Sequence, residues 1–244
     1  MVSIKERIVA LGISVLVMAT IFFLANSGGA RDPVLRIAYT TDLAGVVVTA
    51  ASGVTEDLHG LRLADCCGTQ AEIALESGVF DMAVLCPDAA ELFLQGDRPF
   101  VLVGGIVQNA NVLVRVTNNS PVSIGYTFGR ASQREAALEH FSTDVTFIPM
   151  TTLALPFALA SGAVDAVVLD VLTATNSDAA LIITPLPHER PSSVLVVRED
   201  ILGTTLYSEF LRAYNETIDK GVENIWSDFG VNFLSLPEEL YILP

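Results

Sequence analysis

From Val34 onward, short apolar runs alternate with stretches of helical spacing, which is typical of strands and helices that follow one another along the chain. The expected strands are Val34–Tyr39, Leu61–Cys66, Phe80–Cys86, Phe100–Val107, Ser123–Tyr126, Val145–Pro149, Val164–Leu169, Leu181–Pro185 and Ser193–Arg198. The expected helices are Leu43–Ser52, Thr69–Glu76, Asp88–Gln95, Ser132–Phe141, Thr152–Ala160 and Leu206–Trp226. Ser132 and Glu135 have the spacing of a capping box at one helix start. This alternation predicts an α/β fold with mostly parallel sheets covered by helices.

One stretch of this pattern occurs twice. Residues 74–85 and 158–169 share the pattern A-L-x-S-G-x-x-D-x-x-V-L, in which each copy is a helix end, a glycine, an aspartate and a buried strand. Each glycine suits a left-handed helix cap, and Asp81 and Asp165 are expected to cap turns. Two similar α/β units in one chain predict two lobes of similar build.

The first thirty residues differ from the rest. Lys5 and Arg7 precede an uncharged apolar run, Ile8–Ala25, and residues 26–30 are small and polar. This is the pattern of an export signal. The run is close to the roughly 20 residues that span a bilayer, so residues 1–30 are predicted to be either a cleaved signal peptide or an N-terminal membrane anchor.

The 244-residue chain has a formal net charge of −15 and 51% hydrophobic residues. That charge repels a phosphate backbone, which excludes nucleic acid as an expected partner, and it also disfavours docking on an anionic membrane surface. The three cysteines, Cys66, Cys67 and Cys86, lack the spacing of a zinc site, so no metal and no cofactor are expected. Their simplest interpretation is as small buried apolar residues.

Several segments together resemble a known family. They are Ala74-Leu75, Ser77-Gly78 with Asp81, Gly104–Val114, Ser123–Tyr126, Ala158-Leu159, Ser161-Gly162 and Val164–Val168. The chain is similar, over about Val34–Trp226, to the type 2 periplasmic binding fold, in particular to nitrate-, sulfonate- and taurine-type substrate-binding proteins of ABC transporters. The resemblance implies two lobes that close on a small molecule, which is then delivered to a transporter permease.

The expected organisation follows from the repeat and the resemblance. Residues 31–113 and 192–244 form lobe 1 and residues 114–191 form lobe 2, with Asn111–Asn119 and Glu189–Glu199 as the two linkers. The protein is expected outside the cytoplasm, in the periplasm or on the outer face of the cell membrane. It is expected to act as a monomer that touches the membrane only through residues 8–25 if these are not cleaved.

Candidate binding residues follow from strand ends, because ligands of open parallel sheets bind beyond the carboxyl ends of the strands. The candidates are Thr40, Thr41, Cys67, Thr69, Gln70, Cys86, Asp88, Tyr126, Thr127, Arg130, Thr151 and Asp170. Thr69 and Thr151 supply hydroxyls at helix starts, and Arg130 suits a carboxylate or sulfonate. Asp88 and Asp170 suit an amine or a hydroxyl, so the expected ligand is a small organic molecule, with anions among the candidates.

No enzyme signature such as G-x-S-x-G, H-E-x-x-H or a P-loop occurs in the sequence, so no catalytic residue is expected. Two alternatives to a transport receptor remain open. One is an enzyme on the same fold, similar to menaquinone-pathway enzymes. The other is an extracytoplasmic ligand-sensing domain held by an uncut N-terminal helix.

Overall fold

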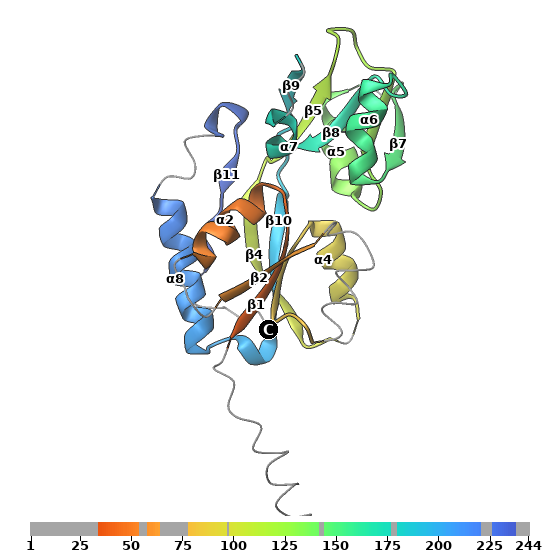
Figure 1. Ribbon diagram of the computed structural model, residues 1–244. Coiled ribbons are helices and arrows are strands. Elements are labelled where there is room, and N and C mark those ends of the chain that lie inside the picture. The colour runs from red at the N-terminus through yellow and green to blue at the C-terminus, as the bar shows by residue number, and fades with distance from the viewer. Residues whose placement is uncertain are drawn as a thin grey trace, which may run out of the picture. The chain divides into compact units, whose positions relative to one another are not determined.

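The computed structural model describes residues 34–53, 58–63, 78–96, 98–141, 144–176, 180–220 and 226–237. Its helices and strands lie in one unit, Leu35–Pro244, and form two mixed sheets (Figure 1). The first sheet has the order β11-β4-β10-β3-β1-β2, with β1 (Leu35–Thr40), β2 (Leu58–Leu63), β3 (Met82–Leu85), β4 (Phe100–Gln108), β10 (Pro191–Arg198) and β11 (Asn232–Phe233). The second sheet has the order β7-β6-β8-β5-β9, with β5 (Asn111–Arg115), β6 (Ser123–Thr127), β7 (Thr146–Met150), β8 (Ala166–Asp170) and β9 (Ile182–Pro185).

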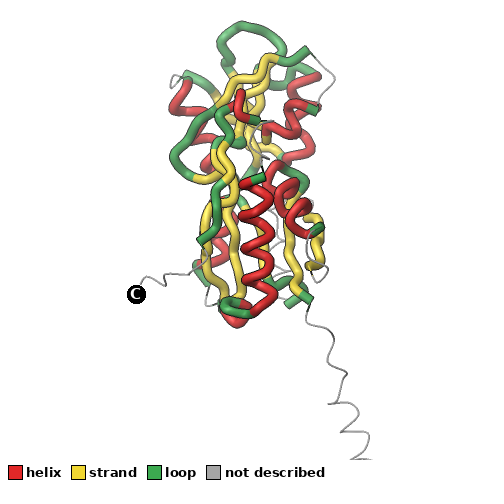
Figure 2. Tube along the Cα trace, turned by 90° about the vertical axis from the view of Figure 1, so that its left-hand side faces the viewer, coloured by secondary structure: helices red, strands yellow, loops and turns green. Residues whose placement is uncertain are grey.

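Helices cover both sheets, and we call each sheet with its helices a lobe. The first lobe has α2 (Leu43–Ser52), α4 (Pro87–Leu94) and α8 (Thr205–Asp219), with 3-10 turns η2 (Glu199–Ile201) and η4 (Ser227–Phe229). The second lobe has α5 (Ala131–His140), α6 (Leu155–Ala160) and α7 (Val171–Thr175), with η1 (Thr152–Ala154). In Figure 1, α2 and α8 lie on one face of the first sheet and α4 on the other, and Figure 2 shows α8 along that face.

Within each sheet, parallel pairing is confined to the repeated units. In the first sheet β1 pairs in parallel with β2 and β3, and in the second sheet β6 pairs in parallel with β7 and β8. The strands that carry the chain between the sheets, β4, β5 and β10, pair antiparallel with their neighbours. Residues at the carboxyl ends of β1, β6 and β8 line one cavity, which is described below.

The chain passes between the sheets twice, from β4 to β5 and from β9 to β10. The first connection is only Asn109–Ala110, with Asn109 at a φ of 61°, because β5 already begins at Asn111. The expected linker Asn111–Asn119 is therefore wrong in its first half, where Val112, Leu113 and Val114 are fully buried as a strand. The expected lobe boundary between residues 113 and 114 falls inside β5.

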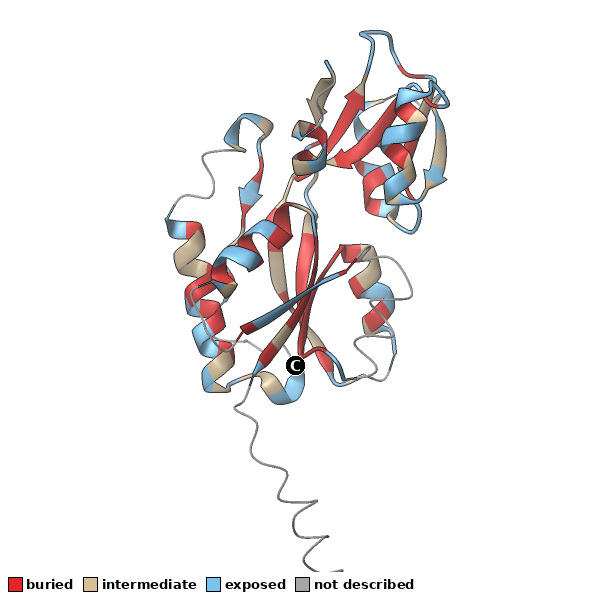
Figure 3. Ribbon diagram, viewed as in Figure 1, coloured by how far each residue is buried: buried red, intermediate tan, exposed pale blue. Residues whose placement is uncertain are grey.

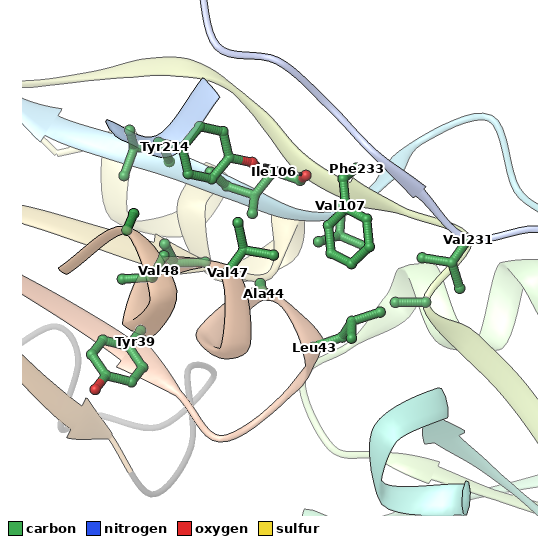
Figure 4. Close-up of a cluster of buried hydrophobic side chains, with 14 of the residues drawn as sticks. Tyr39, Leu43, Ala44, Val47, Val48, Ile106, Val107, Tyr214, Val231 and Phe233 are labelled. Atoms are coloured by element: carbon green, nitrogen blue, oxygen red, sulfur yellow. Dashed lines mark hydrogen bonds between the residues drawn. The ribbon is translucent and has the colours of Figure 1, made fainter. Parts of the chain in front are cut away.

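The core follows the apolar pattern of the strands and of α2. The central strands of both sheets are buried (Figure 3). Figure 4 shows buried side chains from α2, β4, α8 and β11 gathered in one cluster, among them Ala44, Val47, Val48, Ile106, Tyr214 and Phe233. The Tyr214 hydroxyl donates to the carbonyl oxygens of Ile106 (3.2 Å) and Leu234 (3.1 Å), so its polar end is satisfied inside the core.

The structure confirms the predicted repeat in its backbone. Gly78 and Gly162 have φ angles of 67° and 71°, the left-handed values expected for helix caps. Asp81 accepts a hydrogen bond from the N–H of Arg36 in β1 (2.9 Å), and Asp165 accepts one from the N–H of Ser123 in β6 (2.8 Å). Each aspartate thus joins the turn before one strand to the neighbouring parallel strand.

Three local predictions are wrong. The helix predicted over Leu206–Trp226 ends at Asp219. Strand β2 begins at Leu58, three residues before the predicted start, and its middle four residues are exposed, so it has no apolar pattern to mark its bounds. Ser132 does not form a capping box, because the helix begins one residue earlier and the Ser132 hydroxyl donates to Asp88 of the first lobe instead. The predicted helix Thr69–Glu76 and the apolar run Ile8–Ala25 lie outside the described residues. Among the residues that the structure describes, no helix is long and apolar enough to cross a membrane.

Candidate functional site

A small cavity lies between the two lobes, where β1, β6 and β8 end. Its volume is about 60 Å³. It is lined by Thr40, Thr41 and Asp42 of the first lobe and by Thr127, Arg130, Gln133, Thr152, Val168, Leu169, Asp170 and Thr173 of the second. One water needs about 15 Å³ of such volume, so the cavity has room for about four groups of the size of a water molecule. The cavity therefore has the size of a small ligand.

The first lobe supplies the turn that joins β1 to α2. Asp42 is the N-cap of α2, and its Oδ1 accepts from the Gly45 N–H at 3.2 Å. The Thr40 hydroxyl donates to the Asp42 Oδ2 at 2.5 Å. The carboxylate of Asp42 is therefore fixed at the cavity wall by a helix start and by a hydroxyl.

Asp170 at the end of β8 joins the two lobes. It is the N-cap of α7, where its Oδ1 accepts from the Leu172 N–H at 3.0 Å. The same oxygen accepts from the Leu43 N–H, the first residue of α2 in the other lobe, at 3.2 Å. One carboxylate oxygen therefore caps a helix in each lobe, and among the described residues no donor reaches the Asp170 Oδ2.

The surroundings of Asp170 favour its neutral form. Burial raises its pKa to about 8, and the nearby negative charge of Asp42 adds to the rise. The N–H groups of Leu172 and Leu43 and the positive charge of Arg130 act in the opposite direction and are the weaker influences. In the protein without a ligand, burial and the neighbouring carboxylate therefore favour the protonated form of Asp170 near neutral pH.

Buried polar groups of the second lobe hold the far wall of the cavity. The Gln133 side chain accepts from the Thr127 N–H at 3.0 Å and donates to the Asn111 Oδ1 at 3.1 Å. The Thr152 hydroxyl lies 3.4 Å from that of Thr127, to which it donates. Gln133 and Thr127 are both buried, so these contacts fix the end of β6 and the start of α5.

A second contact between the lobes lies beside the cavity. Asp88 in the first turn of α4 accepts from the N–H and the hydroxyl of Ser132 in α5, at 3.2 and 2.5 Å. Arg190, on the second connection, lies within 4 Å of Glu91 of α4 and of Glu135 of α5. Both acidic partners of Arg190 are exposed, so the Asp88–Ser132 pair is the stronger contact. We call the Asp88–Ser132 and Asp170–Leu43 pairs the two clasps.

The structure brings together five of the twelve candidate residues at the cavity: Thr40, Thr41, Thr127, Arg130 and Asp170. Asp88 lies outside it and bonds Ser132. Thr151 is exposed and makes no side-chain cap, and its neighbour Thr152 lines the cavity instead. Cys67, Thr69 and Gln70 lie outside the described residues.

Two further candidates do not line the cavity: Cys86 lies in the hydrophobic core, and Tyr126 is partly buried against it. Cys86 is buried against α4 and the first sheet, as the interpretation of the cysteines as small apolar residues predicts. Tyr126 packs edge-to-face on Phe147, with ring centroids 6.4 Å apart. Its side chain points to the opposite face of β6 from Thr127, because successive strand residues alternate.

The candidate residues omitted six of the lining side chains: Asp42, Gln133, Thr152, Val168, Leu169 and Thr173. Asp42 stands between a strand and a helix, which is the sequence signal of an N-cap at a strand end. Gln133 carries no such signal, because it lies inside the predicted helix and reaches the cavity only through the way α5 packs. Among the described residues no group of acidic, histidine or cysteine side chains has the arrangement of a metal site.

No protein-family model matches the chain, and no curated protein matches its sequence. Solved structures do match. A periplasmic substrate-binding protein of an ABC transporter from Coxiella burnetii has a TM-score of 0.63 at 14% identity, covering 82% of this chain and 100% of that one. A nutrient binding protein from Burkholderia cenocepacia bound to methionine has a TM-score of 0.62 at 14% identity, covering 80% and 97%. The aliphatic sulphonate binding protein of Escherichia coli has a TM-score of 0.57 at 16% identity, covering 85% and 76%. At these identities the likeness concerns the fold, and this chain has the two-lobed α/β fold of ABC-type substrate-binding proteins.

Proposed function

We propose that this protein is an extracytoplasmic solute-binding protein that captures a small polar molecule between its lobes and delivers it to an ABC transporter permease. The observation that carries the proposal is the hydrogen bond between Asp170 of one lobe and the first residue of α2 in the other, at the wall of a cavity that both lobes line. A cavity whose walls come from both lobes exists only while the lobes are together. Ligand binding and lobe closure are therefore one event.

The two connections suit a hinge. Asn109–Ala110 and the segment between β9 and β10 are the only covalent links between the sheets among the described residues. Motion about two short connections leaves each sheet intact and separates Asp88 from Ser132 and Asp170 from Leu43. In this proposal the closed form, with both clasps made, is the one that a permease recognises.

The remaining expectations join the proposal as its finer parts. Residues 1–30 serve as an export signal or a membrane anchor, and the protein works as a monomer. The two lobes follow the two sheets, with the short connection at Asn109–Ala110 as the first hinge, so residues 111–113 belong to lobe 2 and Pro191 to lobe 1. In this proposal the ligand leaves the protein chemically unchanged, as expected of a transport receptor.

The test is a thermal-shift screen of the full chain against amines, amino acids, sulfonates, carboxylates, polyols and pyrimidines. A ligand present at a hundredfold excess over its Kd raises the free energy of unfolding by about 2.7 kcal/mol. Small-angle X-ray scattering with the same compound should show a smaller radius of gyration. Stabilisation with an unchanged compound supports a transport receptor, and conversion of the compound to a product points to an enzyme. The absence of stabilisation by any class contradicts solute binding.

A further inference from the structure

The charges at the cavity wall select among ligand classes. The described lining residues include two carboxylates, Asp42 and Asp170, and one cation, Arg130. The remaining lining groups are five threonine hydroxyls, the Gln133 amide and two apolar side chains. Once Asp170 is ionised, the two carboxylates outnumber the one guanidinium, so an added cation balances the charges at the wall and an added anion does not.

Both carboxylates are held at the wall, and one of them has an oxygen to spare. Backbone N–H groups of α2 and α7 fix Asp42 and Asp170. The Asp170 Oδ2 accepts no hydrogen bond from a described residue, although Oδ1 accepts two. A carboxylate oxygen at a cavity wall that accepts no hydrogen bond from the protein can accept one from a ligand.

We propose that the ligand carries an ammonium group that binds between the carboxylates of Asp42 and Asp170. The ammonium donates hydrogen bonds to the Asp170 Oδ2 and to Asp42, and the threonine hydroxyls take the ligand's other polar groups. This inference rests on the proposed function and names the ligand class of the same cavity. It replaces the expectation that anions are among the candidates.

A proton should leave when the ammonium binds. Burial, with the charge of Asp42, raises the pKa of Asp170 to about 8, so the empty site keeps a proton on this carboxyl near neutral pH. Arg130 and the N–H groups of α7 and α2 reduce that rise. An ammonium group stabilises the ionised carboxylate and takes the place of the proton, whereas an anionic ligand favours retention of the proton.

The cavity sets the size of the probe. Its 60 Å³ corresponds to about four water-sized groups. Ethanolamine has four non-hydrogen atoms, one ammonium and one hydroxyl. Ethylene glycol is its neutral match, in which a hydroxyl replaces the ammonium, and glycolate is a small hydroxy-anion.

The experiment measures binding of these three compounds to the full chain by isothermal titration calorimetry in buffers of different ionisation enthalpy. Ethanolamine should bind, release a fraction of a proton near pH 7, and bind about fivefold more tightly at pH 8, the change that a pKa of about 8 gives. Ethylene glycol should bind at least tenfold more weakly, and glycolate should not bind. The D42N variant should lose most of the preference for ethanolamine, whereas D144N, which removes an exposed carboxylate outside the cavity, should keep it.

Four results of this experiment would contradict the proposed ammonium site. Binding of glycolate with proton uptake, or of ethylene glycol as tightly as ethanolamine, overturns the ammonium site and leaves solute binding intact. No binding of ethanolamine also overturns it, and the wider screen then decides separately whether the protein binds a solute at all. A preference for ethanolamine that survives in D42N shows that the ammonium binds elsewhere.

Discussion

Asp170 and Leu43 lie 127 positions apart in the chain, yet the carboxylate of one accepts the backbone N–H of the other at 3.2 Å. The bond crosses from the second lobe to the helix start of the first. It needs no particular side chain at position 43, so it depends on the backbone of α2 and on residue 170 alone. Substitution at Asp170 therefore tests the closed form directly.

The stability of the protein should decrease as pH rises through the neutral range. The pKa of Asp170 is about 8 in the folded protein against an ordinary value of 3.8, so the folded state holds a proton that the unfolded state has released between these values. The free energy of unfolding therefore decreases across this window as pH rises. Urea unfolding between about pH 6 and pH 9 should show this slope, and it should be smaller in D170N, which keeps an N-cap side chain without the titration. An equal slope in D170N and in the full chain contradicts the assignment.

The Ser132→Ala variant should open the Asp88 clasp. The hydroxyl donates to a carboxylate, and such a bond contributes about 1.5 kcal/mol, so ligand binding should weaken by about tenfold. Scattering of the ligand-free variant should show a larger radius of gyration. Ser161→Ala is the matched control, because the exposed Ser161 hydroxyl bonds only a carbonyl within its own helix end. If both substitutions change ligand binding and the radius of gyration equally, the Asp88–Ser132 contact does not contribute to lobe closure.

The Asp81→Ala variant should be much less stable than the matching Asp165→Ala variant. Asp81 is 2% exposed and is contacted by the guanidinium groups of Arg36 (3.1 Å) and Arg198 (3.0 Å). Its removal leaves two cations without their shared partner and should cost about 3 kcal/mol in the free energy of unfolding. Asp165 is exposed and bonds the start of β6 only, so its loss should cost less. Denaturant unfolding of both variants measures the difference, and equal losses contradict the argument.

The Gly45→Ala variant should disturb the cavity by displacing the turn between β1 and α2. A Cβ at position 45 would lie 1.9 Å from the Thr40 carbonyl oxygen, so the turn that carries Thr40 and Asp42 has to move. We expect a loss of about 2 kcal/mol in stability together with loss of ligand binding. Gly53→Ala, at the other end of α2, meets only ordinary contacts and should leave stability unchanged or raise it by about 0.5 kcal/mol. Ligand binding by G45A at the wild-type level would show that the Thr40 turn is not part of the site.

The elements that the sequence predicted well are those whose pattern is local. Helix α2 has the predicted bounds, because a capping aspartate precedes a run of small apolar residues and a glycine follows it. The repeat predicted the two left-handed glycines and the matching aspartates, because both depend on residues within a few positions. Strand β2 lacks an apolar pattern, since its exposed middle gives no signal of burial.

The sequence predicted a residue of the site only where the position of that residue at the end of a strand is enough to place its side chain at the cavity. Thr40, Thr127 and Asp170 follow from that rule, and Asp42 follows from the same rule taken two residues further. Gln133 reaches the wall through the packing of α5, which no local pattern encodes. Ser132 was assigned to its own helix cap, whereas its acceptor comes from Asp88, 44 residues away.

The strand order of the first sheet also bears on how the chain reaches this fold. Strand β10 lies between β3 and β4, but it is made only after the whole second sheet. While the chain is synthesised or exported from its N-terminus, β3 and β4 therefore have unpaired edges until residues 191–198 are present to form β10. Open edges invite pairing with other chains, so this order favours late, cooperative completion of the first sheet after the second has formed.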